Sequence, residues 1–189
     1  MKFIPSDAWN WSYGEYDGST YLITNLVSDE NVPYKFSTHF KKEDLRKDCA
    51  PSVKQTLCVE DMQLLADFQE GLYSINMLDE IECFDLALNA VACARFVKLT
   101  NPVSNYFMHA VEPETYISRG QIVTLYAIDG AVGDFIVLDD EPQDGLYRLM
   151  LVNKELTIFS YTLKISQMVR VQADRINIFR LKHKKARFA

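Results

Sequence analysis

Residues 86–94 read LALNAVACA, an almost uninterrupted apolar run inside a longer segment with helical periodicity. On a helical wheel the polar residues Glu82, Asp85 and Asn89 share one narrow stripe, and apolar residues fill the opposite side. A helix with so little polar surface must be largely buried. The run is shorter than the roughly 18 to 20 residues that cross a bilayer, so we expect a core helix and no membrane span.

The residues that flank this run indicate the limits of the helix. Asn76 is the expected N-cap, and Arg95 and Lys98 lie at the far end, one turn apart on the side of the apolar stripe. A helix of about three turns precedes it from Glu60, and Gly71 weakens the end of that first helix. Two consecutive helices are therefore expected between residues 60 and 98.

Strand patterns occupy the regions on both sides of the helices. A hairpin is predicted from an alternating segment at 9–13, a turn at 15–18 and a β-rich run at 21–26, with a third strand at 34–40. After Pro102 we expect seven short strands: Tyr106–Val111, Gln121–Ile128, Asp134–Leu138, Leu146–Val152, Leu156–Phe159, Tyr161–Ile165 and Met168–Ala173. Short strands at this spacing are typical of a small barrel or sandwich.

The charge balance changes where the strand-rich region begins. Residues 1–100 carry 9 basic and 16 acidic groups, whereas residues 101–189 carry 11 and 10. We therefore predict an α+β protein with an N-terminal α/β domain at 1–103, in which two helices cover a small sheet. A C-terminal β-barrel-like domain is predicted at 104–180. The basic tail at 181–189 is interpreted as a solvated charge run.

The overall composition is that of an ordinary globular protein, with 48% hydrophobic and 24% charged residues. The net charge of -6 disfavours electrostatic binding of nucleic acid or anionic lipid over a broad surface, although it allows a local basic patch. Pro5, Ser6 and Asp7 interrupt the N-terminal apolar segment, so a standard cleaved signal is not expected. The four cysteines form no dense framework, and we interpret them as reduced thiols.

No catalytic signature is found in the sequence. The phosphate-cradling, dinucleotide-binding, nucleophile-elbow and zinc-protease motifs are all missing, and the three histidines lie one per region. Cys58 and Cys93 are the remaining candidate nucleophiles, but both lie in apolar segments where an unreactive thiol is expected. We therefore predict no enzyme activity, no cofactor, no metal and no small-molecule ligand.

Aromatic residues are concentrated near the N-terminus, where Trp9, Trp11, Tyr13, Tyr16 and Tyr21 share one short stretch. Stacking platforms for single-stranded nucleic acid also need a basic groove, and no Lys or Arg occurs between residues 2 and 35. Core and interface packing is the better explanation. A hairpin that is aromatic but neither catalytic nor basic favours a peptide-binding surface.

Several segments, taken in order, resemble the ZapC family of cytoplasmic cell-division proteins, which associate with the tubulin-like GTPase FtsZ. They are 4–11 (IPSDAWNW), 36–40 (FSTHF), 58–61 (CVED), 86–92 (LALNAVA) with 95–98 (RFVK), and more diffusely 169–176 (VRVQADRI). The resemblance implies an N-terminal α/β domain, a C-terminal β-barrel-like domain and no catalysis. It also implies promotion of FtsZ protofilament bundling and Z-ring stability at midcell, through the FtsZ C-terminal tail.

The sequence also departs from the family pattern. Where the family has Lys-Pro and then Pro-Lys-Ser-Trp, this chain has Lys98-Leu99 and then residues 102–105 (PVSN), so a basic and aromatic segment is lost. The tail after Arg180 is an extension relative to the family. Any partner contact that the family makes through the basic and aromatic segment after the long helix is therefore not carried over to this chain.

Four residues are the predicted partner contacts. Arg95 and Lys98 either complement the dipole of the helix or contact the partner, and Leu22 and Tyr21 are the predicted apolar anchors or ordinary core residues. Two other function classes stay open, a β-barrel nucleic-acid-binding module and a small enzyme with an unrecognised site. Whether one chain uses two surfaces or an oligomer uses one is also left open.

Overall fold

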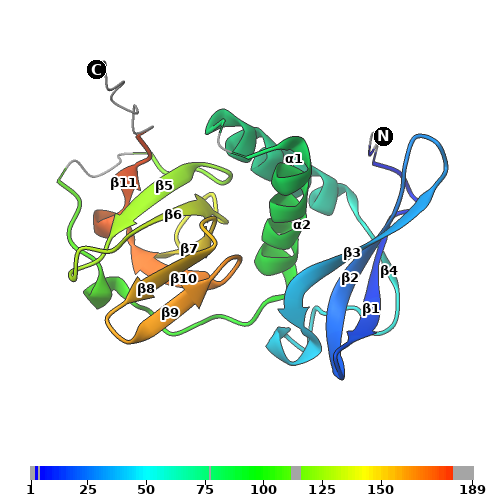
Figure 1. Cartoon of the computed structure of the whole chain (residues 1–189), viewed down its shortest axis with the longest axis horizontal. Coiled ribbons are helices and arrows are strands. Elements are labelled where there is room, and N and C mark those ends of the chain that lie inside the picture. Colours follow the sequence, from blue (N-terminus) through cyan, green and yellow to red (C-terminus); the bar gives the residue numbers. More distant parts are fainter. Residues whose placement is uncertain (1–2, 4, 77, 112–115, 181–189) are drawn as a thin grey trace, which may run out of the picture.

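The computed structural model describes residue 3 and residues 5–76, 78–111 and 116–180. Within these ranges the chain forms three layers, with two helices held between an N-terminal and a C-terminal sheet (Figure 1). This arrangement confirms the predicted α+β class. The predicted basic tail at 181–189 lies outside the described residues.

The N-terminal sheet is antiparallel and has the strand order β3-β2-β1-β4. Its strands are β1 (Asn10–Tyr16), β2 (Ser19–Val27), β3 (Pro33–Lys41) and β4 (Gln55–Thr56), and a short 3-10 turn, η1 (Lys42–Asp44), follows β3. The predicted hairpin is confirmed, with Asp17 and Gly18 at positive φ in its turn. Trp11 pairs with Thr24, and Tyr13 pairs with Leu22. Paired residues share a face of a sheet, and this face covers the helices.

Both helices are present, but their limits differ from the prediction. They are α1 (Val59–Ser74) and α2 (Glu80–Phe96). The N-cap of α2 is Asp79, which accepts hydrogen bonds from the backbone of Ile81 and Glu82, so the expected cap at Asn76 was wrong. Asn76 instead has a φ of 48° in the connection between the helices. Since α2 ends at Phe96, Lys98 lies outside the helix, and the predicted pairing of Arg95 and Lys98 on one helical face was also wrong.

The C-terminal sheet is antiparallel, with the strand order β10-β7-β6-β5-β11, and β8 and β9 form a separate hairpin. The strands are β5 (Ile122–Tyr126), β6 (Val132–Val137), β7 (Leu146–Leu151), β8 (Glu155–Ile158), β9 (Tyr161–Lys164), β10 (Met168–Gln172) and β11 (Asn177–Ile178). Six of the seven predicted strands are confirmed. The predicted strand at Tyr106–Val111 was wrong, because that region holds the 3-10 turn η2 (Ser104–Tyr106) and a single bridge from Phe107 to Ala127. A further 3-10 turn, η3 (Ala173–Arg175), precedes β11. The described strands form an open, barrel-like arrangement and not a closed barrel.

Both faces of the C-terminal sheet are buried. Ile122, Ile136, Met150 and Met168 are register partners in a row across four strands, and they join the core that contains the helices. Their neighbours along the strands, such as Phe135 and Val137, belong to a second core under the β8–β9 hairpin. Burial on both faces explains why these strands read as continuous apolar runs rather than as alternating ones.

Helix α1 meets the C-terminal part at a contact between two glycines. A Cβ atom added to Gly71 would lie 1.8 Å from the carbonyl oxygen of Gly120, and one added to Gly120 would lie 2.6 Å from the carbonyl oxygen of Asp67. Arg119 forms ion pairs of 2.9 Å with Asp67 on α1 and with Asp140. The sheet is therefore fixed against the helix at backbone distance.

Candidate functional site

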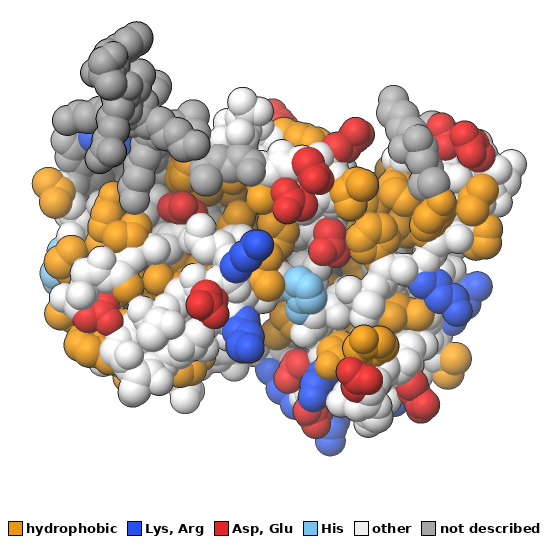
Figure 2. All heavy atoms as spheres, in the orientation of Figure 1, with side chains coloured by type: hydrophobic (Ala, Val, Ile, Leu, Met, Phe, Trp, Pro, Cys, Tyr) orange, Lys and Arg blue, Asp and Glu red, His pale blue; other side chains and the backbone are white. Residues whose placement is uncertain are grey.

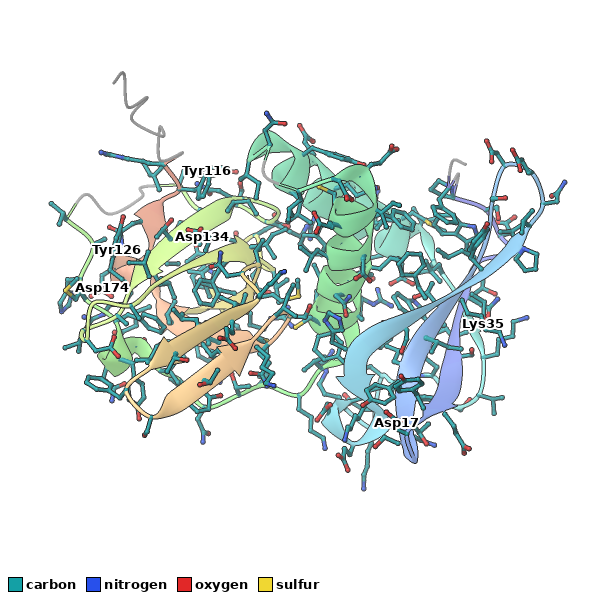
Figure 3. All side chains as sticks on the ribbon, viewed as in Figure 1. Asp17, Lys35, Tyr116, Tyr126, Asp134 and Asp174 are labelled. Atoms are coloured by element: carbon teal, nitrogen blue, oxygen red, sulfur yellow. The ribbon has the colours of Figure 1, made fainter. Side chains whose placement is uncertain are left out.

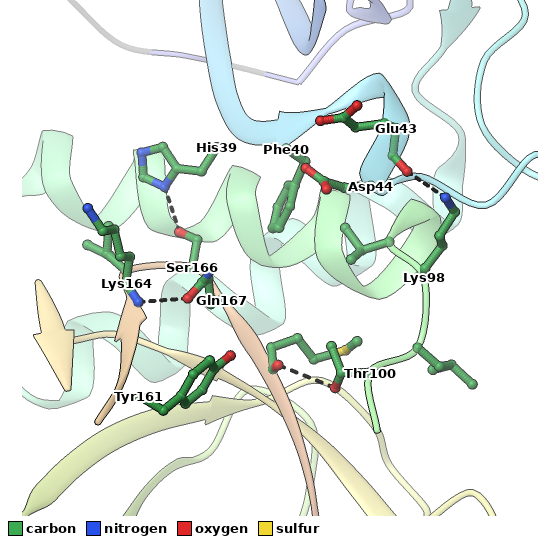
Figure 4. A pocket seen from close by; sticks show the side chains of 14 residues that line it. His39, Phe40, Glu43, Asp44, Lys98, Thr100, Tyr161, Lys164, Ser166 and Gln167 are labelled. Carbon is green, nitrogen blue, oxygen red and sulfur yellow. Dashed lines mark hydrogen bonds between the residues drawn. The ribbon is translucent and has the colours of Figure 1, made fainter. Parts of the chain in front are cut away.

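A groove of about 530 Å³ lies between the two sheets, and we call it the junction groove. Its lining consists of His39, Phe40, Glu43 and Asp44, residues 97–100, Tyr161, and residues 164–168. These residues come from the end of β3 with η1, the segment after α2, and the β9–β10 turn (Figure 4). In the space-filling view, the molecule is hollowed between its two halves, with basic and acidic side chains on both sides of the hollow (Figure 2).

Lys98 reaches the junction groove because the chain leaves α2 in an extended conformation. Val97 has β-region angles and pairs with Leu45. The Lys98 backbone N–H donates to the carbonyl oxygen of Asp44 at 2.9 Å, and its Nζ donates to the carbonyl oxygen of Glu43 at 2.5 Å. The ammonium group is therefore held at the rim of the groove beside η1, while the side chain remains exposed.

The N-terminal and C-terminal walls are joined across the groove by a side-chain contact. His39 Nδ1 lies 2.9 Å from the Ser166 hydroxyl, and the two residues are 127 positions apart in the sequence (Figure 4). Ser166 is buried and has a φ of 66° in the β9–β10 turn. The turn is tightened by Gln167, whose side-chain oxygen accepts the Lys164 backbone N–H at 2.8 Å. This turn fixes the backbone of Lys164, which lines the C-terminal wall of the groove.

The floor of the groove is apolar and its rims carry both charges. Phe40, Val97 and Met168 are more than nine-tenths buried, whereas Leu99 and Tyr161 on the rims are 44% and 58% exposed. Lys98 and Lys164 supply positive charge, and Glu43 and Asp44 supply negative charge on the η1 side. An apolar floor with charged rims suits an extended peptide that carries apolar residues next to charged ones.

Arg95 does not reach the groove, because its side chain folds back onto the start of α1. It forms an ion pair with Glu60, and its Nε lies 3.4 Å from Asp61 Oδ1. Asp61 is fully buried, and it accepts hydrogen bonds from the Trp11 indole at 3.2 Å and from the Cys58 backbone at 3.0 Å. Arg95 is therefore the counter-ion of a buried carboxylate.

Leu22 and Tyr21 lie on opposite faces of β2. Leu22 is 0% exposed and belongs to the core between the sheet and the helices, so its side chain is not accessible to a partner in the folded protein. Tyr21 is half-buried on the outer face, and Lys41 Nζ lies 6.0 Å from its ring centre. Of the four predicted contacts, only Lys98 lies in the junction groove.

Sequence reasoning missed most of the groove. His39, Tyr161, Lys164 and Ser166 come from segments that only the tertiary fold brings together. The backbone conformation of Ser166 has no sequence signal, because a serine takes a position that usually favours glycine. One signal was available: the departure from the family pattern begins at Leu99, directly after Lys98, in the segment that also contributes Leu99 and Thr100 to the groove.

The structure describes both cysteines that the sequence offers as candidate nucleophiles, Cys58 and Cys93. Burial raises the pKa of the Cys93 thiol to about 12, which keeps it protonated at neutral pH. Cys58 is exposed at the N-cap of α1. Among the described residues, no group of three or more His, Cys, Asp or Glu side chains is placed to hold a metal ion.

Comparison with known proteins gives one family match and two relatives that align over most of this chain. The family model described as the N-terminal part of the cell-division protein ZapC matches residues 2–98. The Cell division protein ZapC of Xenorhabdus bovienii is 24% identical over 176 residues, which cover 93% of this chain and 91% of the relative. The Cell division protein ZapC of Aeromonas hydrophila is 28% identical over 182 residues, which cover 94% and 93%.

These matches agree with the described architecture. The matched segment includes the N-terminal sheet and both helices, and it ends at Lys98, where the chain enters the junction groove. The two relatives align over the C-terminal sheet as well, since they cover more than nine-tenths of this chain. No helix in the described part of the chain is long and apolar enough to cross a membrane. The chain belongs to the ZapC family of cell-division proteins.

Proposed function

We propose that this protein is a non-enzymatic cell-division factor that binds FtsZ and promotes protofilament bundling and Z-ring stability. It acts in the cytoplasm at the division site, and its contact with FtsZ is made in the junction groove. The observation that carries the proposal is the groove itself, which combines an apolar floor with Lys98 and Lys164 in a chain of net charge -6. Membership of the ZapC family supplies the link to cell division.

The floor of the groove supports binding through apolar contacts. A buried Leu or Phe side chain contributes ~1.5 to 3 kcal/mol, whereas an exposed ion pair contributes ~0 to 1 kcal/mol. Leu99 and Tyr161 have exposed apolar surface that a partner side chain would cover. Affinity therefore comes mainly from one or two partner side chains placed between these rims and the floor.

The charges on the rims then determine the orientation of the partner. Lys98 and Lys164 attract carboxylates, and Glu43 and Asp44 attract basic groups. The C-terminal tail of FtsZ, which by family resemblance carries apolar residues flanked by charge, is the proposed occupant. Long-range repulsion between two acidic proteins makes this short-range contact necessary.

Sedimentation of FtsZ polymers in GTP tests the proposal. The wild-type chain should enter the pellet and increase bundling, and Lys98→Glu with Lys164→Glu should reduce both several-fold. The control is Lys35→Glu with Lys54→Glu, which makes the same charge change at exposed residues outside the groove. The proposal is contradicted if only the control variant loses sedimentation and bundling, or if the wild-type chain does not sediment with FtsZ.

A second arm of the experiment uses FtsZ without its C-terminal tail. Loss of sedimentation with this protein supports the tail as the occupant, whereas full retention overturns that assignment and leaves FtsZ binding intact. Raising the salt concentration should weaken binding only gradually, because burial dominates over screened charge. A steep, many-fold loss at moderate salt would show that electrostatics dominate.

A further inference from the structure

The apolar run of helix α2 contains a single polar residue, and it lies away from solvent. Asn89 is the only polar residue in the run 86–94, and its side chain is 0% exposed. Burial of an amide is costly unless its hydrogen bonds are made. Asn89 Nδ2 donates to the carbonyl oxygen of Asp85 at 2.9 Å, and Asn89 Oδ1 accepts the His39 backbone N–H at 2.8 Å. The core helix therefore holds the backbone of a residue that lines the junction groove.

Strand β3 is irregular at the point where Asn89 holds it. The register of β3 with β2 shifts at residues 38–40, which have no regular partners in the described ladder. The His39 N–H lies in this irregular segment and bonds to a side chain instead of a neighbouring strand. Figure 3 shows Lys35, earlier in β3, on the side of the molecule away from the C-terminal sheet. The irregular segment is thus the part of β3 that meets the C-terminal sheet, and β-bulges commonly redirect a side chain next to a functional site.

The opposite wall of the groove has an irregular backbone of its own. Ser166 is 1% exposed and has a φ of 66°, which costs a residue other than glycine free energy unless its surroundings hold it. Its backbone N–H donates to the carbonyl oxygen of Leu151 at 2.9 Å, and its hydroxyl lies 2.9 Å from His39 Nδ1. Two irregular segments therefore meet at one side-chain contact. Backbone strain of this kind is concentrated at active sites and ligand clamps.

We propose that Asn89, His39 and Ser166 form a relay that preorganises the junction groove for an extended peptide. The relay runs from α2 through β3 to the β9–β10 turn, so it fixes the separation of the two walls. A site that is already held in its binding conformation loses less entropy when the partner binds, which strengthens binding. The inference rests on the proposed function. It gives the buried residues Asn89 and Ser166 a positioning role and no contact with the partner.

Calorimetric titration of the full chain with a synthetic FtsZ tail peptide tests the relay. Ser166→Gly removes the hydroxyl and adopts the positive φ without strain, so the Tm should stay within about 2 °C of the wild-type value. Its affinity for the peptide should fall roughly three- to tenfold, as expected for one lost hydrogen bond. The control is Ser160→Gly, the same change in the exposed β8–β9 turn outside the groove lining, and it should leave the affinity unchanged.

A second pair of variants tests the other side of the contact. His39→Val removes the ring nitrogen and should weaken peptide binding as much as Ser166→Gly does. His39→Asn also carries a hydrogen-bonding atom on Cγ, so it should retain most of the affinity. Binding that Ser166→Gly and His39→Val leave unchanged, or make tighter, would overturn the relay.

Amide hydrogen exchange without FtsZ separates the relay from the proposed function. Exchange is read on the wall opposite to the substitution, where no residue has been altered. His39→Val should speed exchange at residues 164–168, and Ser166→Gly should speed it at 37–41, because each wall loses its tie to the other. Unchanged exchange on the opposite wall would overturn the relay. Faster exchange there, with no peptide binding by the wild-type chain, would support the relay and refute the proposed occupant.

Discussion

Helix propensity alone predicts that Gly71→Ala stabilises the protein, whereas the structure predicts that this substitution destabilises it. Gly71 lies within α1, where alanine is favoured over glycine by ~1 kcal/mol. In the folded protein, however, the new Cβ would lie 1.8 Å from the Gly120 carbonyl oxygen and 2.8 Å from its carbon. Because Gly120 is itself held by a 2.9 Å hydrogen bond from its N–H to Val137, the loop at 118–121 cannot move away without loss.

The expected cost follows from this overlap. Relief requires the loop to shift by more than an ångström and strains the Arg119 ion pairs to Asp67 and Asp140. Overpacking of a tight contact costs ~1 to 3 kcal/mol or more, and the helix gain offsets only part of that. We expect Gly71→Ala to lower the free energy of unfolding by ~2 kcal/mol and the Tm by about 4 to 8 °C.

Thermal unfolding followed by circular dichroism is the assay, and Gly14→Ala is the control. A Cβ at Gly14 would meet only the side chain of Ile23, at 3.2 Å, so a change below ~1 kcal/mol is expected. If Gly71→Ala raises the Tm by a few degrees, as propensity predicts, the close contact between α1 and the C-terminal part is wrong.

Further predictions concern the predicted contacts, the linker and pH. Arg95→Met should lower the free energy of unfolding by ~2 kcal/mol in urea titrations, because buried Asp61 loses its counter-ion, whereas Lys98→Met should change it by less than ~0.5 kcal/mol. Leu22→Ala should cost ~2 to 4 kcal/mol by the same assay, and a stable variant would show that Leu22 is not core. Trypsin should cut in the exposed segment after Lys98, near the proposed domain boundary. The two fragments should co-elute in gel filtration, because α2 packs on both sheets. Separated fragments, or cleavage confined to the chain beyond Arg180, would count against this prediction. Burial raises the pKa of Asp85, so its ionisation costs stability at neutral pH. Asp85→Asn should therefore raise the Tm at pH 7, with a gain that vanishes below about pH 4; a gain that persists at low pH would refute the cause.

Local patterns account for the parts of the fold that could be predicted. The apolar run at 86–94 is helical and buried in every position but one, and the turn at Asp17 and Gly18 lies between two paired strands. Both features depend on periodicity and turn chemistry within a short window. Leu22 and Tyr21 show the limit of this reasoning. Alternation along a strand places them on opposite faces of the sheet, but it does not tell which face packs on the helices.

Tertiary contacts determine the parts that could not be predicted. No Gly or Pro stops α2 at Phe96; the helix ends there because Val97 pairs with Leu45 and Lys98 with Asp44. Gly71 looked like a weak helix end, but it is the position where the helix backbone meets Gly120. The junction groove depends on the same long-range contacts, which is why a single groove residue, Lys98, was among the predicted sites.

Photocrosslinking between a residue of the junction groove and FtsZ tests directly whether FtsZ binds in this groove. Tyr161 on the groove rim is 58% exposed, and Tyr16 at the tip of the β1–β2 hairpin is 69% exposed, so p-benzoylphenylalanine can replace either with little change in the fold. We predict that position 161 crosslinks to polymerised FtsZ, that an excess of the tail peptide suppresses the product, and that position 16 gives none. A crosslink from position 16 alone, or from neither position while the chain still sediments with FtsZ, would contradict binding in the junction groove.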